Sequence, residues 1–254
     1  MEVLILGSGS FIPTEDRSSP SVLIKTEKTY LLLDIGPGTV RQIKKAGLSC
    51  ISIKHILISH FHPDHTADLI HFMFFMKNIG SEFQSPFTVH GPPGIRNFIR
   101  GIQRAYGNSL NLPAEILRID EMGKKARRDF DDVTVISFPV KHSPESVGYR
   151  IEASGKRIVY SGDTGFCEEI IEASKDVDLL ILECSFPEEY LRKYKIDTHL
   201  SPDSAGRIAG SANVKNLVLT HLYPECLKTD IIGSCKRHYK GNVIIAKDFL
   251  RIKI

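Results

Sequence analysis

The most informative stretch of this sequence is Ser59-His60-Phe61-His62-Pro63-Asp64-His65. It lies between an apolar run that predicts a strand and a stretch that predicts a helix. Imidazole and carboxylate groups are ligands suited to zinc and similar divalent ions, and burying four such groups unpaired would be costly. Because alternate residues of a loop can face one point, His60 and His62 could share one ion. Asp64 and His65 could then address a second ion as the chain turns into the helix.

Three further positions repeat this arrangement, in which a polar side chain of the ligand type follows an apolar strand. They are His142 after Phe138-Pro139-Val140, Asp163 after Ile158-Val159-Tyr160, and His221 after Leu217-Val218-Leu219. Taken singly, each of them is more often a core or loop residue than a ligand. In α/β sheets, however, the loops at strand ends converge on one pocket. Together with the first cluster, the three positions therefore predict one shared metal site.

Short β-type runs alternate with helical stretches along the chain. The predicted strands are residues 3–6, 21–25, 30–34, 55–59, 87–90, 133–140, 147–152, 157–160, 179–183, 217–220 and 242–245. The predicted helices are residues 39–46, 67–77, 95–106, 167–174, 202–211 and 228–239. This order favours a layered α/β protein with mixed sheets. No linker or shift of composition divides the sequence, so we expect residues 1–254 to form a single domain.

The composition is that of an ordinary globular protein, with 42% apolar and 25% charged residues among 254. This balance excludes a disordered chain, a collagen-like fibre and a coiled coil. No apolar run approaches the roughly 20 residues of a membrane-spanning helix, and the first seven residues predict a strand rather than a signal peptide. We therefore expect a cytoplasmic protein with no membrane partner. Five cysteines without a C-x-x-C spacing suggest neither a disulfide framework nor a thiolate zinc site.

The net charge of +3 is too small to identify a nucleic-acid-binding protein by composition alone. Two local clusters are nevertheless basic: Lys124, Lys125, Arg127 and Arg128, and Lys236, Arg237, His238 and Lys240. We interpret both clusters as a solvated loop or helix face, and contact with RNA is the alternative.

Motifs that carry polar residues follow one another in a fixed order between residues 31 and 221. They are Asp34 in Leu31-Leu32-Leu33-Asp34-Ile35-Gly36, His60-x-His62-x-Asp64-His65, His142, Ser161-Gly162-Asp163-Thr164-Gly165 and Leu219-Thr220-His221. The set resembles the five-part signature of metallo-β-lactamase-fold hydrolases. This resemblance implies an α/β fold, a four-layer αβ/βα sandwich of two mixed sheets, with a two-metal site at the edge between them.

The resemblance also implies a role for each residue of the signature. His60, His62 and His142 would hold one ion, Asp64, His65 and His221 would hold the other, and Asp163 would bridge the two. Asp34 would orient the ligands through hydrogen bonds from outside the cluster. The implied cofactor is two divalent metal ions, with zinc expected and manganese as the alternative.

Further motifs make the sequence similar to ribonuclease Z and related phosphodiesterases. They are Leu6-Gly7-Ser8-Gly9-Ser10 with Pro13 and Arg17, His90-Gly91-Pro92-Pro93-Gly94, Gly148-Tyr149-Arg150, Leu182-Glu183-Cys184-Ser185-Phe186 and Thr198-His199-Leu200-Ser201. A dinucleotide-binding loop at residues 7–9 is disfavoured, because Ile12 stands where a third glycine is expected. The catalytic residues implied are Asp64, Glu183 and His199. We expect Glu183 to hold His199 as the acid that protonates the leaving oxygen. In the alternative interpretation, His199 caps the next helix or packs in the loop.

The sequence also departs from bacterial tRNA-processing ribonuclease Z, which carries a long flexible arm between its third and fourth metal motifs. Only 21 residues separate His142 from Asp163 here, and two predicted strands with the tight turn Ala153-Ser154-Gly155-Lys156 fill them. Asp68 stands where the family has a glycine, and Ser18 where an asparagine is frequent. These departures concern the tRNA substrate rather than the chemistry.

The leading hypothesis is a dinuclear-metal phosphodiesterase acting on an RNA 3′ end, a cyclic nucleotide or a small phosphodiester. A thioester or other acyl hydrolase of the same fold is the second hypothesis, and the pair of Glu183 and His199 favours the first. A non-catalytic metal-binding scaffold or RNA-binding subunit is the third, and the complete ligand set disfavours it. A redox di-iron protein is disfavoured because a carboxylate is expected there at the position of His62. A homodimer is implied by the resemblance alone.

Overall fold

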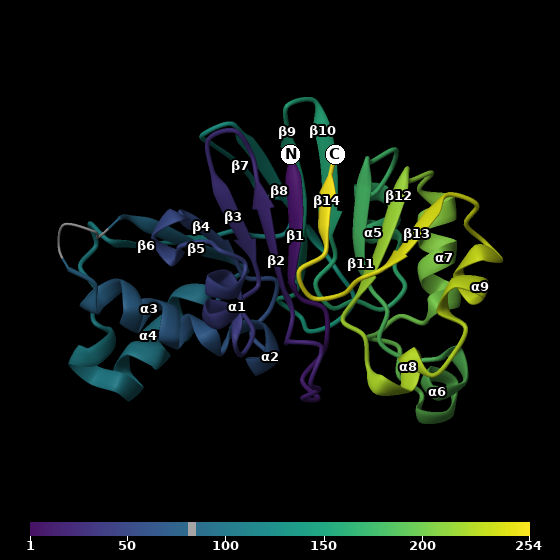
Figure 1. The fold of residues 1–254 in the computed structure, drawn as a ribbon, viewed down its shortest axis with the longest axis horizontal. Helices are drawn as coiled ribbons and strands as arrows, with labels where there is room; N and C mark the ends of the chain where they lie inside the picture. Colours follow the sequence, from purple (N-terminus) through teal and green to yellow (C-terminus); the bar gives the residue numbers. More distant parts are fainter. Residues whose placement is uncertain (81–84) are drawn as a thin grey trace.

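The computed structural model describes residues 1–80 and 85–254, and within them the strands form two seven-stranded sheets (Figure 1). The first sheet consists, in spatial order, of β14 (Arg251–Lys253), β1 (Glu2–Gly7), β2 (Ser21–Lys25), β3 (Tyr30–Leu33), β4 (His55–Leu57), β5 (Phe87–Gly91) and β6 (Leu117–Glu121). The second consists of β13 (Asn242–Ile245), β12 (Asn216–Thr220), β11 (Leu179–Glu183), β10 (Lys156–Tyr160), β9 (Val147–Ala153), β8 (Val133–Pro139) and β7 (Arg127–Phe130). Each sheet contains both parallel and antiparallel pairs, so both are mixed.

The two sheets pack face to face over a shared apolar core. In β1, Val3 and Ile5 face this core, whereas Leu4 and Leu6 point to the opposite side of the sheet. Ile158 of β10 faces the same inner core from the second sheet. Because successive side chains of a strand point to opposite faces, an uninterrupted apolar run marks a strand that is buried on both faces.

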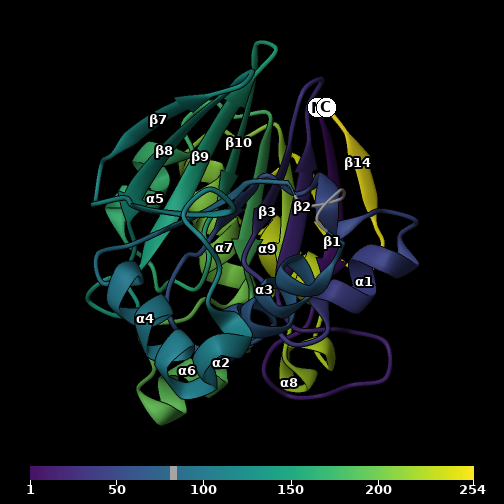
Figure 2. The ribbon, with the colours of Figure 1, turned by 90° about the vertical axis from the view of Figure 1, so that its left-hand side faces the viewer.

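Helices cover the outer faces of the two sheets, and short ones lie at one end of the sheets (Figure 1). They are α1 (Thr39–Lys45), α2 (Pro63–Thr66), α3 (Asp68–Asn78), α4 (Ile95–Tyr106), α5 (Glu168–Ala173), α6 (Glu188–Tyr194), α7 (Pro202–Ser211), α8 (Pro224–Leu227) and α9 (Ile231–Lys236), with 3₁₀ turns at Cys50–Ser52 and Gly107–Leu110. Helices α1, α3 and α4 pack on the first sheet, and α5, α7 and α9 pack on the second (Figures 1 and 2). The predicted four-layer αβ/βα sandwich is therefore confirmed. None of the helices within the described residues is both long and apolar enough to cross a membrane.

The sequence patterns located most elements within one or two residues, and the predicted helix 95–106 coincides with α4. Two predicted helices are different in the structure. The predicted helix 67–77 is α3 alone, preceded by the separate turn α2, which starts at Pro63. The predicted helix 228–239 is shorter, because Asp230 caps α9 and the helix ends at Lys236.

The basic cluster at residues 124–128 is only partly the solvated loop that we expected, because Lys124 and Lys125 lie in an exposed turn but the two arginines do not. Arg127 and Arg128 belong to β7, which pairs with β8 at the edge of the second sheet. Arg128 makes two hydrogen bonds, of 2.8 and 3.0 Å, to the carboxylate of Asp120 in β6, and it therefore links the edges of the two sheets. The short hairpin of β9 and β10 fills the interval between His142 and Asp163, as the sequence predicted.

Candidate metal centre

The metal centre is assembled where strands of both sheets end. Strands β3 and β4 are parallel in the first sheet, and β10, β11 and β12 are parallel in the second. The residues of interest follow or end these strands: Asp34 after β3, His60 and His62 after β4, Asp163 after β10, Glu183 in β11 and His221 after β12. Because parallel strands end at the same edge, residues far apart in sequence are brought to one place.

Two residues of this edge adopt a backbone conformation that is unusual for their type. Asp34 has φ of 55° and His221 has φ of 56°, both in the left-handed region. Non-glycine residues in this region are uncommon, and at functional sites the surrounding structure holds them there. Asp34 directly follows β3, and His221 directly follows β12. The chain therefore turns away from the sheet at both residues, and their side chains point toward the cluster.

Gly36 and Gly162 let neighbouring chain segments approach the cluster closely. A Cβ atom at Gly36 would lie 2.0 Å from the carbonyl oxygen of Asp64, and one at Gly162 would lie 2.6 Å from the Cβ of Ser59. Gly162 also has φ of 59°. Glycine is therefore needed at both positions for the loops that carry Asp64 and Asp163 to pack together.

All seven predicted ligands lie together at this edge, in two adjoining groups. The donor atoms of His60, His62, His142 and Asp163 all lie within 4.8 Å of one another. Asp64, His65 and His221 form a second group by the same measure. Asp163 and His221 also form a third group with His199, so the two groups adjoin.

Asp163 lies between the two groups. Its Oδ2 atom is 3.9 Å from Nε2 of His60 and 3.9 Å from Nε2 of His142. Its Oδ1 atom is 3.2 Å from Nε2 of His65 and 3.4 Å from Nε2 of His221. Each carboxylate oxygen thus faces one group, which is the geometry that a bridging ligand requires.

Four of the five ligand histidines are held by hydrogen bonds on the side of the ring that faces away from the cluster, whereas the ring of His62 lies against His142. Nδ1 of His65 lies 2.7 Å from Asp34, and Nδ1 of His60 lies 3.0 Å from Ser59. Nδ1 of His221 lies 2.9 Å from Ser185, and Nδ1 of His142 lies 3.1 Å from the carbonyl oxygen of Thr198. Such partners fix the orientation of a ligating imidazole, and here they leave each Nε2 atom directed at the cluster.

Several of these inward atoms are buried without a hydrogen-bond partner: Nε2 of His60, Nε2 of His65 and Oδ1 of Asp163. An unpaired buried polar atom is costly, so such a set indicates a missing partner. Zinc lies about 2.0–2.1 Å from a histidine nitrogen, so two ligand atoms on one ion are separated by roughly 3–4 Å. The observed spacing fits divalent metal ions at this place.

The pKa values of His60 and Asp163 suit metal binding. The pKa of His65 differs, because burial would lower it but the carboxylates of Asp163 and Asp34 hold it well above its ordinary value. Burial holds the pKa of His60 well below its ordinary value, so its imidazole is neutral, the form that binds a metal. Burial alone would raise the pKa of Asp163, but His221 and His65 beside it hold that pKa well below the ordinary range. Asp163 is therefore ionised and able to act as a ligand.

Glu183 and His199 form a pair beside the cluster. Oε1 of the buried Glu183 lies 3.0 Å from Nδ1 of His199, and the same carboxylate accepts hydrogen bonds from the backbone N–H groups of Thr164 and Leu200. Burial lowers the pKa of His199, but the carboxylate outweighs burial and raises this pKa to about 9. His199 also lies within 4.8 Å of Asp163 and His221, so it adjoins both groups of candidate ligands.

The alternative interpretation of His199 as a helix cap is wrong. Ser201 is the N-cap of α7, and its side chain accepts a hydrogen bond from the backbone N–H of Ser204. The Nδ1 atom of His199 is engaged by Glu183, so Nε2 is the nitrogen that can reach a bound molecule.

A cavity of about 480 Å³ opens at the cluster and is lined by Phe11, His62, Pro63, Asp64, Asp163, His199 and Tyr223. Phe11 and Tyr223 were not singled out from the sequence. Phe11 is 64% exposed and packs edge-on against Tyr223, with ring centroids 5.6 Å apart. An exposed aromatic residue in the opening loop was a possible signal, but nothing in the sequence placed it beside residue 223.

The sequence analysis also missed the residues that position the ligands. Tyr160 donates a hydrogen bond of 2.7 Å to Asp34, and Ser185 lies against His221. Both lie within motifs that drew attention for other residues. Their roles depend on contacts between strands that only the folded chain makes.

Comparison with known proteins agrees with this fold and this cluster. The model of the beta-lactamase superfamily domain matches residues 29–222. Ribonuclease Z of Methanosarcina mazei is 26% identical, and the alignment covers 100% of this chain and 98% of that protein. That alignment extends over 303 positions, whereas this chain has 254 residues, so the relative contains segments that this chain lacks.

Solved structures show the same fold over the full chain. The metallo-beta-lactamase fold protein YhfI from Bacillus subtilis is 20% identical, with a TM-score of 0.86, and the match covers 99% of this chain and 98% of that one. The short form of human tRNase Z is 24% identical, with a TM-score of 0.81, and the match covers 100% and 99% of the two chains. The chain therefore belongs to the beta-lactamase superfamily, as a metallo-β-lactamase-fold hydrolase similar to ribonuclease Z.

Proposed function

We propose that this protein is a dinuclear-metal phosphodiesterase that cleaves an RNA 3′ end, a cyclic nucleotide or a small phosphodiester. The observation that carries the proposal is the position of the Glu183–His199 pair, which lies against the cluster of seven ligand residues. Relatives named ribonuclease Z, which match along the full length of this chain, support the same class of substrate. Bound divalent ions, zinc or manganese, would supply an activated water and would neutralise charge on the phosphodiester.

The side chains of the site would have three roles: holding the ions, orienting the ligands and protonating the leaving oxygen. His60, His62, His142, Asp64, His65 and His221 would hold the ions, with Asp163 shared between them. Asp34 orients His65 through its hydrogen bond to Nδ1. His199 would give its proton to the leaving oxygen, because the rigidly held Glu183 keeps the imidazole charged and in place. General acid catalysis of this kind contributes about 10²–10⁴-fold to a rate.

The test is a side-by-side assay of bis-p-nitrophenyl phosphate, a thioester, a cyclic nucleotide and a 3′-extended tRNA, each with zinc and with manganese. We expect hydrolysis of the phosphodiesters and little hydrolysis of the thioester. The matched control is Asp163→Asn, which keeps the size of the side chain but should lose the activity together with the ions. A faster reaction with the thioester would favour an acyl hydrolase, and metal-loaded protein without any activity would favour a binding scaffold.

The same assay addresses the missing arm. Recognition of tRNA requires phosphate contacts far from the cleavage site, mostly from lysine and arginine. The short hairpin of β9 and β10 cannot supply the contacts of an arm. We therefore expect weak processing of tRNA beside good activity on small diesters, and processing as efficient as that of an armed enzyme would contradict this expectation.

We further propose that the reaction takes place in the cytoplasm. In support of this, all five cysteines are free, which suits a reducing compartment. The homodimer that the resemblance implies stays a prediction.

A further inference from the structure

A second cavity, of about 470 Å³, lies next to the metal centre on the far side of His199. Its wall is formed by the loop after β8, by α6 and the segment that follows it, and by the first turns of α7. The residues that line it are Lys141, Phe166, Glu188, Leu191, Arg192, Lys195, Ile196, Asp197, His199, Ser204 and Arg207. His199 is the residue that lines both this cavity and the one at the metal cluster.

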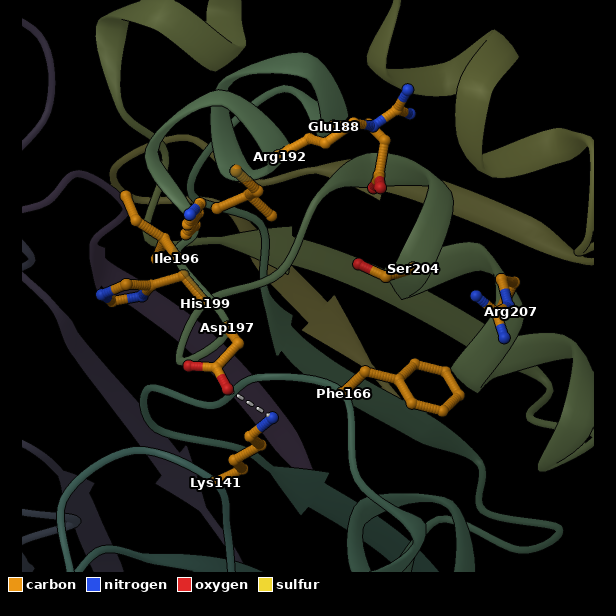
Figure 3. Close-up of a pocket in the computed structure, with 11 residues that line it drawn as sticks. Lys141, Phe166, Glu188, Arg192, Ile196, Asp197, His199, Ser204 and Arg207 are labelled. Atoms are coloured by element: carbon orange, nitrogen blue, oxygen red, sulfur yellow. Dashed lines mark ion pairs between the residues drawn. The ribbon is translucent and has the colours of Figure 1, made fainter.

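The charge of the wall is predominantly positive. Lys141, Arg192, Lys195 and Arg207 contribute four cations, against the carboxylates of Glu188 and Asp197. In Figure 3, Lys141 and Asp197 point toward each other, and their ion pair of 2.8 Å neutralises that cation.

The other cations of the wall have no carboxylate partner. Arg192 and Lys195 form no ion pair with any residue in the ranges 1–80 and 85–254. The guanidinium of Arg207 lies over the ring of Phe166, 4.7 Å from its centroid, at the side of the view opposite His199 (Figure 3). With Lys141 and Asp197 paired, the wall therefore carries three cations against the single carboxylate of Glu188.

The relation of this cavity to the metal centre indicates what would enter it. A diester at the metal cluster would have its leaving oxygen beside His199, and the group attached to that oxygen would extend past His199. In a nucleotide chain, the next charged group along that direction is another phosphate. Arginine and lysine are the side chains that bind phosphate best, because each presents several charged donors.

We propose that the cavity lined by Arg192, Lys195 and Arg207 binds a second phosphate, on the leaving side of the scissile diester. This inference deepens the proposed function and rests on it. It means that the preferred substrate is a nucleotide with phosphates on both sides of a nucleoside, rather than a diester with a neutral leaving group.

The first experiment compares ligands that the enzyme does not need to cleave. Adenosine 3′,5′-bisphosphate is titrated into the metal-loaded protein by calorimetry and compared with adenosine 3′-monophosphate and adenosine 5′-monophosphate. Hydrogen bonds to charged groups contribute about 1.5–3 kcal/mol, so we expect the bisphosphate to bind roughly 10- to 100-fold more tightly. The double variant R192Q/K195Q should lose this advantage, so that it binds the bisphosphate about as tightly as the monophosphates.

The control is the double variant K124Q/K125Q, which removes the same charge from an exposed segment outside the cavity. It should bind the bisphosphate as the unmodified protein does. The proposal would be overturned if R192Q/K195Q still bound the bisphosphate more tightly than the monophosphates. It would also be overturned, in favour of general electrostatic attraction, if K124Q/K125Q lost this difference to the same extent. Equal affinity of all three ligands for the unmodified protein would overturn it as well.

The second experiment uses activity and separates this proposal from the proposed function. R192Q/K195Q should hydrolyse bis-p-nitrophenyl phosphate at an unchanged rate, since that substrate has no second phosphate. It should hydrolyse a dinucleotide bearing a terminal phosphate with a KM raised about tenfold or more. If the unmodified protein hydrolyses no diester, the proposed function fails, whereas the titration still decides whether the cavity binds phosphate.

Discussion

Oδ2 of Asp34 lies 2.7 Å from Nδ1 of His65, and both residues are fully buried. The same carboxylate accepts hydrogen bonds of 2.7 Å from the backbone N–H and the hydroxyl of Ser59, and another of 2.7 Å from the hydroxyl of Tyr160. Ser59 belongs to the first sheet's loop and Tyr160 to the second sheet. A single carboxylate thus joins both sheets to a ligand of the metal centre.

Replacing Asp34 should therefore weaken both the fold and the metal site. Asp34→Asn keeps the size of the side chain and tolerates a positive φ. Its amide N–H group, however, would face Ser59, His65 and Tyr160, which themselves donate hydrogen bonds to Asp34. We expect about 2–4 kcal/mol lower free energy of unfolding in urea, and metal affinity reduced about 10–100-fold in competition with a chelator. Asp176→Asn is the matched control, because Asp176 also has a positive φ, of 53°, but is exposed. Equal values for the two variants would contradict this role of Asp34.

The geometry of Asp163 predicts how metal content responds to substitution. The purified protein should bind two divalent ions per chain, as measured by elemental analysis after reconstitution with zinc. Asp163→Ala should lose both ions because its two oxygens face both groups, whereas His62→Ala should lose one, since His62 belongs to one group. A single ion in the unmodified protein, or one retained by Asp163→Ala, would be incompatible with a shared carboxylate.

The Glu183–His199 pair predicts a dependence on the leaving group. His199→Ala should keep both ions, lower the rate strongly for poor leaving groups such as ribose hydroxyls, and lower it much less for p-nitrophenolate. The reason is that an alkoxide departs slowly unless it is protonated, an effect of about 10²–10⁴-fold. The check is kcat on both substrates, with metal content measured in parallel. Equal losses on the two substrates, or loss of metal, would assign His199 a structural role.

His55 is the first residue of β4, and its ring stacks on Phe130 of β7, away from the candidate ligands. Its burial there predicts a dependence of stability on pH. Burial and the nearby His90, 3.0 Å away, lower the pKa of His55 to about 4, from an ordinary value of about 6.5. In the unfolded chain His55 takes up its proton as the pH falls through 6.5, whereas the folded protein takes it up near pH 4. As the pH falls between those two values, the protein therefore loses stability through His55, by about 3 kcal/mol in total.

The measurement is urea unfolding at pH 7.5 and at pH 4.5. His55→Gln cannot titrate, so it should lose about 2–3 kcal/mol less than the unmodified protein over this interval. His71→Gln, at a histidine whose side chain is 60% exposed, should behave like the unmodified protein. The explanation fails if His55→Gln loses as much stability as the unmodified protein does.

Helices and strands that are marked by a local pattern of apolar residues could be predicted from the sequence alone. Helix α4 begins and ends where the apolar spacing placed it, and the strands that are buried on both faces stand out as apolar runs. The seven candidate ligands were found because each is adjacent to such a strand or lies within one six-residue stretch. Local spacing was sufficient there, since a strand end and the loop after it are set by neighbouring residues.

The edge strands of the two sheets and the hydrogen-bond partners of the candidate ligands became visible only in the folded structure. Strands β6, β7 and β14 were missed because their sequences are polar, and pairing with a neighbouring strand makes them β-structure. The partners of the imidazoles come from other strands and loops, as Tyr160 does for Asp34 and Ser185 for His221. The basic cavity likewise joins residues 141, 192, 195 and 207. Hydrogen bonds and cavities arise between segments that are distant in the chain, so no local pattern in the sequence encodes them.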